Sequence, residues 1–77
     1  MSETVRELTL ILMYLTSWKE YEDELRRAWK GYDFGIINQL ADEGLIIDGR
    51  RSKSIHISND GEAKIPDLLK KYGIKPE

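Results

Sequence analysis

The sequence predicts a mostly helical α+β fold, a single domain over residues 1–77 with four helical segments and one two-stranded β-hairpin. Apolar side chains recur at three- and four-residue spacing through most of the chain, which is typical of amphipathic helices. Between residues 45 and 57 the pattern changes to two short apolar runs on either side of a polar loop, which indicates a hairpin. Residues that favour helix ends stand between the segments and separate them.

The first helix is predicted from Val5 to Trp18. Its inward face is expected to hold the residues at helical spacing, namely Val5, Leu8, Ile11, Leu12, Leu15 and Trp18. Leu10, Met13 and Tyr14 lie on the other side of the same cylinder. A helix that is apolar around so much of its circumference needs cover on more than one side, either from the rest of a small domain or from a partner.

A second helix is predicted to begin at Ser17, because Ser17 and Glu20 have the spacing of a capping box. Its buried stripe would consist of Tyr21, Leu25, Ala28 and Trp29, and Gly31 would end it.

The third helix is predicted to be capped by Asp33, with Phe34, Ile37, Leu40 and Ala41 turned inward. Gly44 supplies the left-handed residue of its C-cap, and Leu45 is expected to fold back on Leu40. The linker Gly31-Tyr32 is so short that the second and third helices must cross steeply, as in helix-turn-helix units.

In the hairpin, Leu45 and Ile47 share one face, as do Ile55 and Ile57, whereas His56 points the opposite way. The loop between the strands carries three cations and no acidic residue, at Arg50, Arg51 and Lys53. Two interpretations stay open. The cations contact a polyanion, or they merely protect an exposed sheet edge from aggregation.

The last helix is predicted to begin at Ser58, with Gly61 three residues further on and an inward stripe of Ile65, Leu68, Leu69 and Tyr72. Pro66 lacks a backbone donor, so a kink or restart is expected between Lys64 and Pro66. The tail from Gly73 to Glu77 is expected to fray.

Composition narrows the function classes. A chain of 77 residues with 40% hydrophobic content builds one small core, which usually needs a supplement. With no cysteine and a single histidine, neither disulfides nor a tetrahedral metal site is expected, which leaves self-association as the supplement.

We expect no cofactor and no enzymatic activity, since no nucleophile constellation or glycine-rich phosphate loop is present. The chain has no apolar run of about 20 residues and no cationic start, so we expect a cytoplasmic protein without membrane contact.

Charge is distributed unevenly although the net charge is only −2. Residues 26–58 carry six basic and four acidic side chains, whereas residues 1–25 carry two and six. The positive charge therefore lies in the middle third of the chain, around the third helix and the hairpin.

Two resemblances bear on these elements. The succession "LADEGLI" at Leu40–Ile46, a basic hairpin and "SIHISNDG" at Ser54–Gly61 is similar to the end of many bacterial winged-helix regulators. Over nearly the whole chain, "YLTSW" at Tyr14–Trp18, "RAWKGYDF" at Arg27–Phe34 and the segment Ser52–Gly61 resemble a family of short bacterial proteins with no assigned biochemical function. The resemblance implies a winged helix-turn-helix fold with the hairpin as the wing.

If the winged-helix plan applies, the helix from Asp33 to Glu43 would enter the major groove of double-stranded DNA, where Asn38 and Gln39 have the chemistry to pair with adenine. That helix contains no lysine or arginine, and its carboxylates would be repelled by phosphates. Contacts to the phosphate backbone of the DNA would then come from the wing and its neighbours, namely Arg50, Arg51, Lys53, Ser54, Lys30, Tyr32 and Arg27.

Two hypotheses follow from the sequence. The first is a small DNA-binding protein with weak sequence selectivity, a candidate homodimer acting in transcription regulation. The second is a protein-interaction or dimerisation module without DNA binding, with Leu10, Met13 and Tyr14 as its interface.

Overall fold

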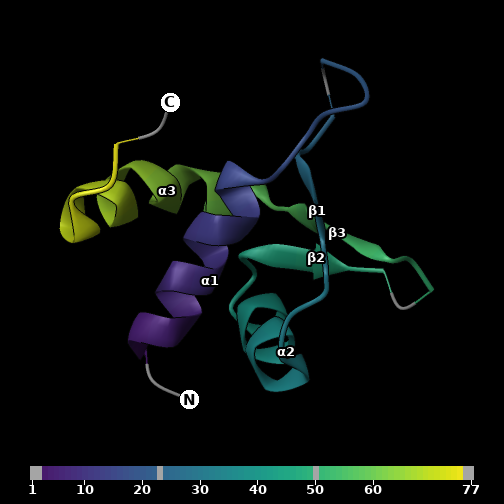
Figure 1. Cartoon of the computed structure of the whole chain (residues 1–77). Helices are drawn as coiled ribbons and strands as arrows, with labels where there is room; N and C mark the ends of the chain where they lie inside the picture. The colour runs from purple at the N-terminus through teal and green to yellow at the C-terminus, as the bar shows by residue number, and fades with distance from the viewer. Residues whose placement is uncertain (1–2, 23, 50, 76–77) are drawn as a thin grey trace.

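Three helices and a three-stranded antiparallel sheet share one core in this computed structural model, which describes residues 3–22, 24–49 and 51–75 (Figure 1). The elements in order are α1 (Glu3–Leu15), β1 (Arg27–Trp29), α2 (Phe34–Asp42), β2 (Ile46–Asp48), β3 (Ser54–Ile57) and α3 (Asn59–Tyr72). The predicted mostly helical α+β class is confirmed, but the prediction of four helical segments is wrong.

The described residues of the segment predicted as the second helix form an isolated bridge at Trp18, bends and a turn, and then β1. Trp18 and Arg27 exchange two backbone hydrogen bonds of 2.9 and 2.8 Å, which close the loop between them. Ser17 does not cap a helix; its hydroxyl donates to the carbonyl of Tyr14 and accepts from Arg26. Pairing with β3 therefore overrides the local helix signal, and the described residues 17–22 and 24–31 contain no helix that could form a helix-turn-helix with α2.

The sheet has the order β1-β3-β2, so β3 is its central strand. Ala28 pairs with Ile55 and Ile46 with Ile57, and these four side chains are buried on the inner face. Leu45 takes no part in the alternation because it lies in the turn after α2, before β2 begins. Ile47 consequently lies on the outer face opposite His56, and it is 51% exposed.

The predicted helix ends at Asp33, Gly44 and Ser58 are confirmed. Asp33 accepts hydrogen bonds from two backbone N–H groups of the first turn of α2. Gly44 has a φ of 75°, and the N–H of the following residue returns to the carbonyl of Leu40. Ser58 accepts from the N–H of Gly61. These ends depend on local side-chain chemistry, which the sequence displays directly.

Three details differ from prediction. Phe34 is 80% exposed rather than inward, because it follows the cap on the outer side of α2. α3 continues through Pro66 without the expected restart. The tail was predicted to fray from Gly73, but Gly73 is a left-handed C-cap of α3. Ile74 packs against the core, and its N–H donates to the carbonyl of Leu69 at 2.9 Å.

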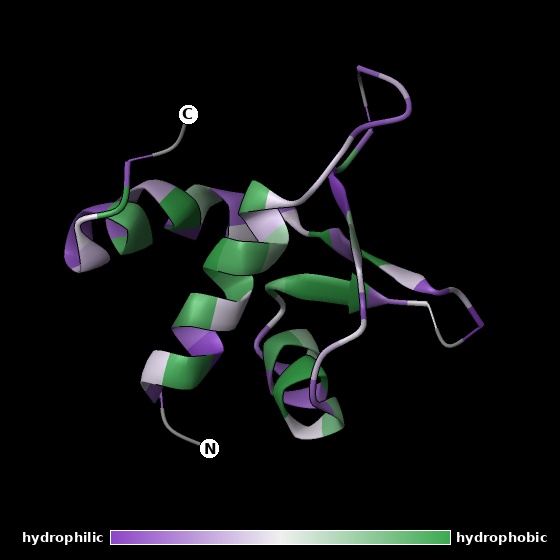
Figure 2. Ribbon diagram, viewed as in Figure 1, coloured by the Kyte–Doolittle hydropathy of each residue, from purple (hydrophilic) through white to green (hydrophobic). Residues whose placement is uncertain are grey.

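The core is drawn from every element, as the hydrophobic segments of Figure 2 indicate. The N-terminus of α3 comes unusually close to the turn after α2. A Cβ at Gly61 would lie 2.1 Å from the carbonyl oxygen of Leu45, so only glycine allows this approach. The close approach holds the β2–β3 hairpin and α3 in fixed relation to α2.

Candidate functional site

The tip of the β2–β3 hairpin projects away from the helices (Figure 1). Arg51 and Lys53 are exposed there and form no ion pair with the described part of the chain, whereas Arg50 lies outside the described residues. Ser54 is half-buried, and its hydroxyl lies 3.1 Å from that of Ser52. Only part of the predicted phosphate-binding set is therefore available at the tip.

Lys30 braces the hairpin. Its ammonium group donates to Asp48 Oδ1 at 2.8 Å and to the carbonyl of Gly49 at 3.3 Å, and its backbone N–H donates to the carbonyl of Lys53 at 3.2 Å. A lysine that is neutralised by the hairpin's own carboxylate adds little to phosphate binding.

Arg27 is likewise engaged within the chain. Its guanidinium lies 2.9 Å from Glu20 Oε1, and its Nε donates to Nε2 of His56 at 3.2 Å. Lys30 and Arg27, which were both predicted to contact phosphates, thus pair with carboxylates of the same chain.

The outward side of α2 does not form a cationic surface. Asn38 is exposed, but Gln39 is half-buried, and its Oε1 is enclosed without a hydrogen-bond partner. Tyr32 packs against the core. Of the residues predicted to contact DNA, Asn38, Arg51 and Lys53 are therefore exposed, whereas Gln39 and Tyr32 are half-buried.

The predicted interface on α1 lies inside the protein. Leu10 and Met13 are 1% and 0% exposed, and Tyr14 packs against the core below the guanidinium of Arg26, whose Cζ lies 5.3 Å from the ring centre. The prediction placed Leu10, Met13 and Tyr14 outward and most of the opposite row inward, and the structure reverses this except at Ile11, which is buried as predicted. Both sides have helical spacing, so periodicity cannot tell which one meets the domain.

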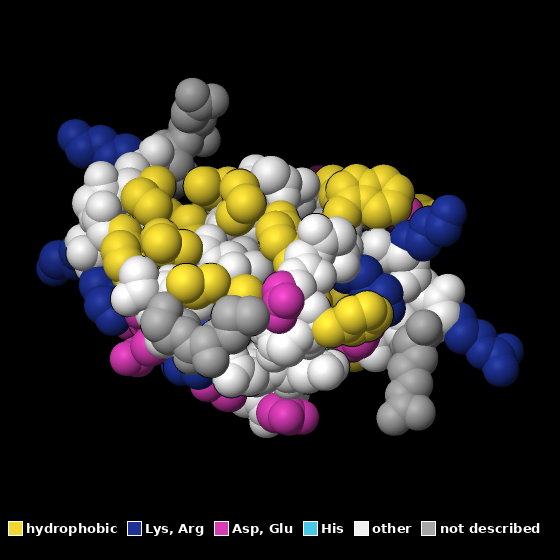
Figure 3. All heavy atoms as spheres, turned by 60° about the horizontal axis from the view of Figure 1, so that its bottom comes forward, with side chains coloured by type: hydrophobic (Ala, Val, Ile, Leu, Met, Phe, Trp, Pro, Cys, Tyr) yellow, Lys and Arg dark blue, Asp and Glu magenta, His cyan; other side chains and the backbone are white. Residues whose placement is uncertain are grey.

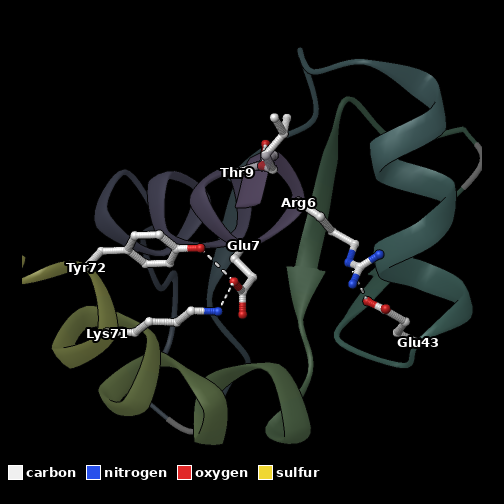
Figure 4. Close-up of polar contacts among 7 residues, drawn as sticks. Arg6, Glu7, Thr9, Glu43, Lys71 and Tyr72 are labelled. Carbon is white, nitrogen blue, oxygen red and sulfur yellow. Dashed lines mark hydrogen bonds and ion pairs between the residues drawn. The ribbon is translucent and has the colours of Figure 1, made fainter. Parts of the chain in front are cut away.

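Polar contacts at the N-terminal half of α1 hold this orientation (Figure 4). Arg6 Nε lies 3.3 Å from Glu43 Oε2 at the end of α2, and Glu7 Oε1 accepts hydrogen bonds from Lys71 at 2.7 Å and from the Tyr72 hydroxyl at 2.6 Å on α3. The hydrogen bond from Lys71, followed by that from Tyr72, lowers the pKa of Glu7 below its ordinary value of 4.5. The same contact raises the pKa values of Lys71 and Tyr72.

The side of α1 that faces solvent is a row of aliphatic residues. We call it the α1 stripe; it consists of Val5, Leu8, Leu12 and Leu15, which are 43%, 41%, 48% and 45% exposed. Figure 3 shows hydrophobic side chains gathered over the half of the molecule that contains α1. Scattered single apolar residues are ordinary on a protein surface, but a continuous row along one helix is typical of a contact surface.

A second exposed apolar area lies on the outer face of the sheet. Trp29 is 62% exposed, and its ring centre lies 5.5 Å from that of Trp18. Ile47 emerges from the same face. Both tryptophans were predicted to lie in helices, so this pair was not expected from the sequence.

The hollow between α1, α2 and α3 is too small to bind an ordinary small molecule. This hollow measures about 40 Å³ and is lined by residues that include Arg6, Glu7 and Glu43. Pockets for small ligands are usually about 300 Å³ or larger, so the hollow accommodates only a few water molecules. No helix among the described residues is long and apolar enough to cross a membrane.

Comparison with known proteins gives the family. The chain belongs to the family described as "Domain of unknown function (DUF6429)", whose sequence profile matches residues 1–75. The chain is also 30% identical over 70 residues to "Uncharacterized protein y4hR" from Sinorhizobium fredii (strain NBRC 101917 / NGR234), an alignment that covers 90% of this chain and 88% of that protein. No solved structure matches the chain. These findings agree with the predicted resemblance to short bacterial proteins of unassigned function, and neither assigns a winged-helix fold.

Proposed function

We propose that this DUF6429 domain is a protein-interaction module of winged-helix-like plan, which uses the α1 stripe to bind an uncharged, apolar helix. The winged-helix comparison is supported by the order of the sheet, β1-β3-β2, and by the antiparallel hairpin that follows α2. A strand and a loop take the place of the first helix of a helix-turn-helix. The function is one of binding, not catalysis.

The observation that carries the proposal is the exposure of all four residues of the α1 stripe, each above two-fifths of its surface. The charges of α1 do not interrupt the row, because Arg6 and Glu7 are engaged on the opposite side with α2 and α3. An apolar row without charges favours a partner of the same chemistry, since a charged partner would lose its hydration without gaining an ion pair.

Site-specific photo-crosslinking in the cells that produce the protein tests the proposal. A photoreactive amino acid in place of Leu8 should give a discrete covalent adduct, and the additional change Leu12→Glu should abolish it. The same photoreactive residue in place of Lys70, which is exposed on α3, is the matched control. An adduct at Leu8 no stronger than that at Lys70 contradicts the proposal.

A second candidate function is weak binding to the backbone of double-stranded DNA through the hairpin tip. It is favoured by one observation, the exposure of Arg51 and Lys53 without an ion pair to any described residue. It is opposed by the net charge of −2 and by the carboxylates of α2.

Titration of labelled duplex DNA at two salt concentrations separates the two candidates. If the tip binds phosphates, Arg51→Ala with Lys53→Ala should weaken binding at low salt, and the log–log salt slope should change by about 0.9 for each lost contact. The control carries Lys70→Ala with Lys75→Ala, which removes the same charge from the end of α3, on the other side of the molecule from the tip (Figure 1). Equal binding by both double variants, or no binding by the parent, removes the DNA candidate.

A further inference from the structure

We infer that the partner of the α1 stripe is a second copy of this chain, bound with its α1 antiparallel to the first across a two-fold axis. This inference rests on the proposed function, and it adds the identity and direction of the partner.

The spacing of the α1 stripe suits a helix pair. Its members are separated by three, four and three residues, which is the a/d spacing of a two-helix seam. The series also reads the same in both directions. When two copies lie antiparallel, Val5 of one therefore faces Leu15 of the other, and Leu8 faces Leu12. A surface that matches itself after a half-turn is what an isologous two-fold interface requires.

The flanking positions of α1 itself carry no charge, so the helix offers no like charges to a second α1. Thr4 and the buried Ile11 lie on one side of the row, and Thr9 and Thr16 lie on the other. In coiled coils the flanking positions usually carry the charges that select or reject partners. The uncharged flanking positions of α1 do not repel an identical helix, and they form no ion pair with a charged one.

Two of the flanking hydroxyl groups are already satisfied within the helix. Thr9 Oγ1 donates to the carbonyl of Val5 at 2.7 Å, and Thr16 Oγ1 donates to the carbonyl of Leu12 at 2.8 Å. A buried donor without a hydrogen-bond partner destabilises an interface. Because these two hydroxyl groups keep their partners, a second copy can cover them without that cost. The edge of the stripe is thus compatible with a dry seam.

The direction follows from the helix itself. Aligned peptide dipoles leave partial positive charge at the N-terminus of α1 and partial negative charge at its C-terminus. Antiparallel pairing places opposite ends side by side, whereas parallel pairing places like ends together. The helix has 13 residues, or about 20 Å. So short a seam lies at the lower end of interface sizes, so the association is expected to be weak and to depend on concentration.

Size measurement and directed disulfide formation test the inference on the purified full chain. Light scattering across the micromolar range should approach twice the 9.0 kDa of one chain, and Leu12→Glu should return the mass to that of one chain while the circular dichroism stays unchanged. Leu12 is 48% exposed, so this variant is expected to fold.

Because the chain has no cysteine, introduced thiols report on direction. Leu8→Cys and Leu12→Cys chains, one of them mass-tagged, are mixed and oxidised gently. Antiparallel pairing should give mainly the mixed disulfide, and parallel pairing would give like-with-like disulfides. Lys70→Cys is the control for random collision.

Three results would overturn the inference: a mass of 9.0 kDa at all concentrations, a predominance of like-with-like disulfides, or equal yields from the Lys70→Cys control. The proposed function fails separately. If photo-crosslinking at Leu8 gives an adduct that contains a different protein while the purified chain stays monomeric, the stripe is an interaction surface and the second copy is not its partner.

Discussion

The change Gly61→Ala tests the contact that joins α3 to the rest of the domain. A Cβ at this position would lie 2.1 Å from the carbonyl oxygen of Leu45 and 3.0 Å from its carbonyl carbon. A carbon and a carbonyl oxygen in close contact are usually about 3.3 Å apart. Since both Leu45 atoms belong to the backbone, no side-chain rotation relieves the overlap, and the two segments must separate by about 1 Å.

The expected loss of stability follows from the bonds that this separation breaks. The N–H of Ser58 donates to the carbonyl of Leu45 at 3.1 Å, and its hydroxyl donates to the carbonyl of Gly44 at 2.6 Å. Two hydrogen bonds contribute about 2 kcal/mol, overpacking costs about 1–3 kcal/mol, and alanine regains roughly 1 kcal/mol of helix propensity. The free energy of unfolding should fall by about 2–4 kcal/mol, a large part of the roughly 4–12 kcal/mol expected for 77 residues.

Equilibrium urea unfolding, followed by tryptophan fluorescence and far-UV circular dichroism at one protein concentration, measures this loss. A fixed concentration is needed because self-association would add to the apparent stability. The matched control is Gly31→Ala, since a Cβ at Gly31 meets nothing within 4 Å and should change stability by less than about 0.5 kcal/mol. If Gly61→Ala unfolds at the same urea concentration as Gly31→Ala, the close approach of α3 to the turn after α2 is refuted.

Three further predictions concern the polar contacts. Ionised Glu7, whose pKa is lowered chiefly by Lys71, stabilises the fold above its ordinary pKa of 4.5 and ceases to do so as the pH falls through the lowered value. The difference in urea midpoint between the parent and Glu7→Gln should therefore be present at neutral pH and vanish in strong acid; a difference independent of pH would contradict this. Asp33→Ala should lower the free energy of unfolding by about 1 kcal/mol through loss of the helix cap, whereas Asp33→Asn should retain most of it in the same assay. Lys30→Met should break the contact with Asp48 and accelerate amide hydrogen exchange in the hairpin loop, measured by NMR; unchanged exchange would show that the ammonium group does not brace the loop.

Local signals in the sequence predicted several features correctly. The caps at Asp33, Gly44 and Ser58 were predictable because each depends on the hydrogen bonds or backbone freedom of one residue type. The β2–β3 hairpin was predictable because two β-branched runs flank a polar loop. The capping signal at Ser17 failed, since the same hydroxyl serves the loop that leads to β1. A short strand such as Arg27–Trp29 has too few residues to show a period of its own.

The candidate site depended more on tertiary structure. The sequence placed Lys30 and Arg27 in a basic set, but Asp48 and Glu20 neutralise them across distances that only the folded chain defines. It also placed the inward side of α1 on residues of which only Ile11 is buried. Leu10 and Met13 are buried, and Leu8 and Leu12 face solvent, although all four have the same hydrophobic character.

By itself, therefore, the sequence determined the mostly helical α+β class, the helix ends at Asp33, Gly44 and Ser58 and the presence of a hairpin after α2, because these depend largely on interactions within a few residues. The tertiary structure alone decided which strand replaces the second predicted helix, which cations remain unpaired and which side of α1 is left for a partner. Both apolar sides of α1 have helical spacing, so the choice between them depends on what α1 meets in the folded chain, namely the shared core and the contacts of Arg6 and Glu7 with α2 and α3.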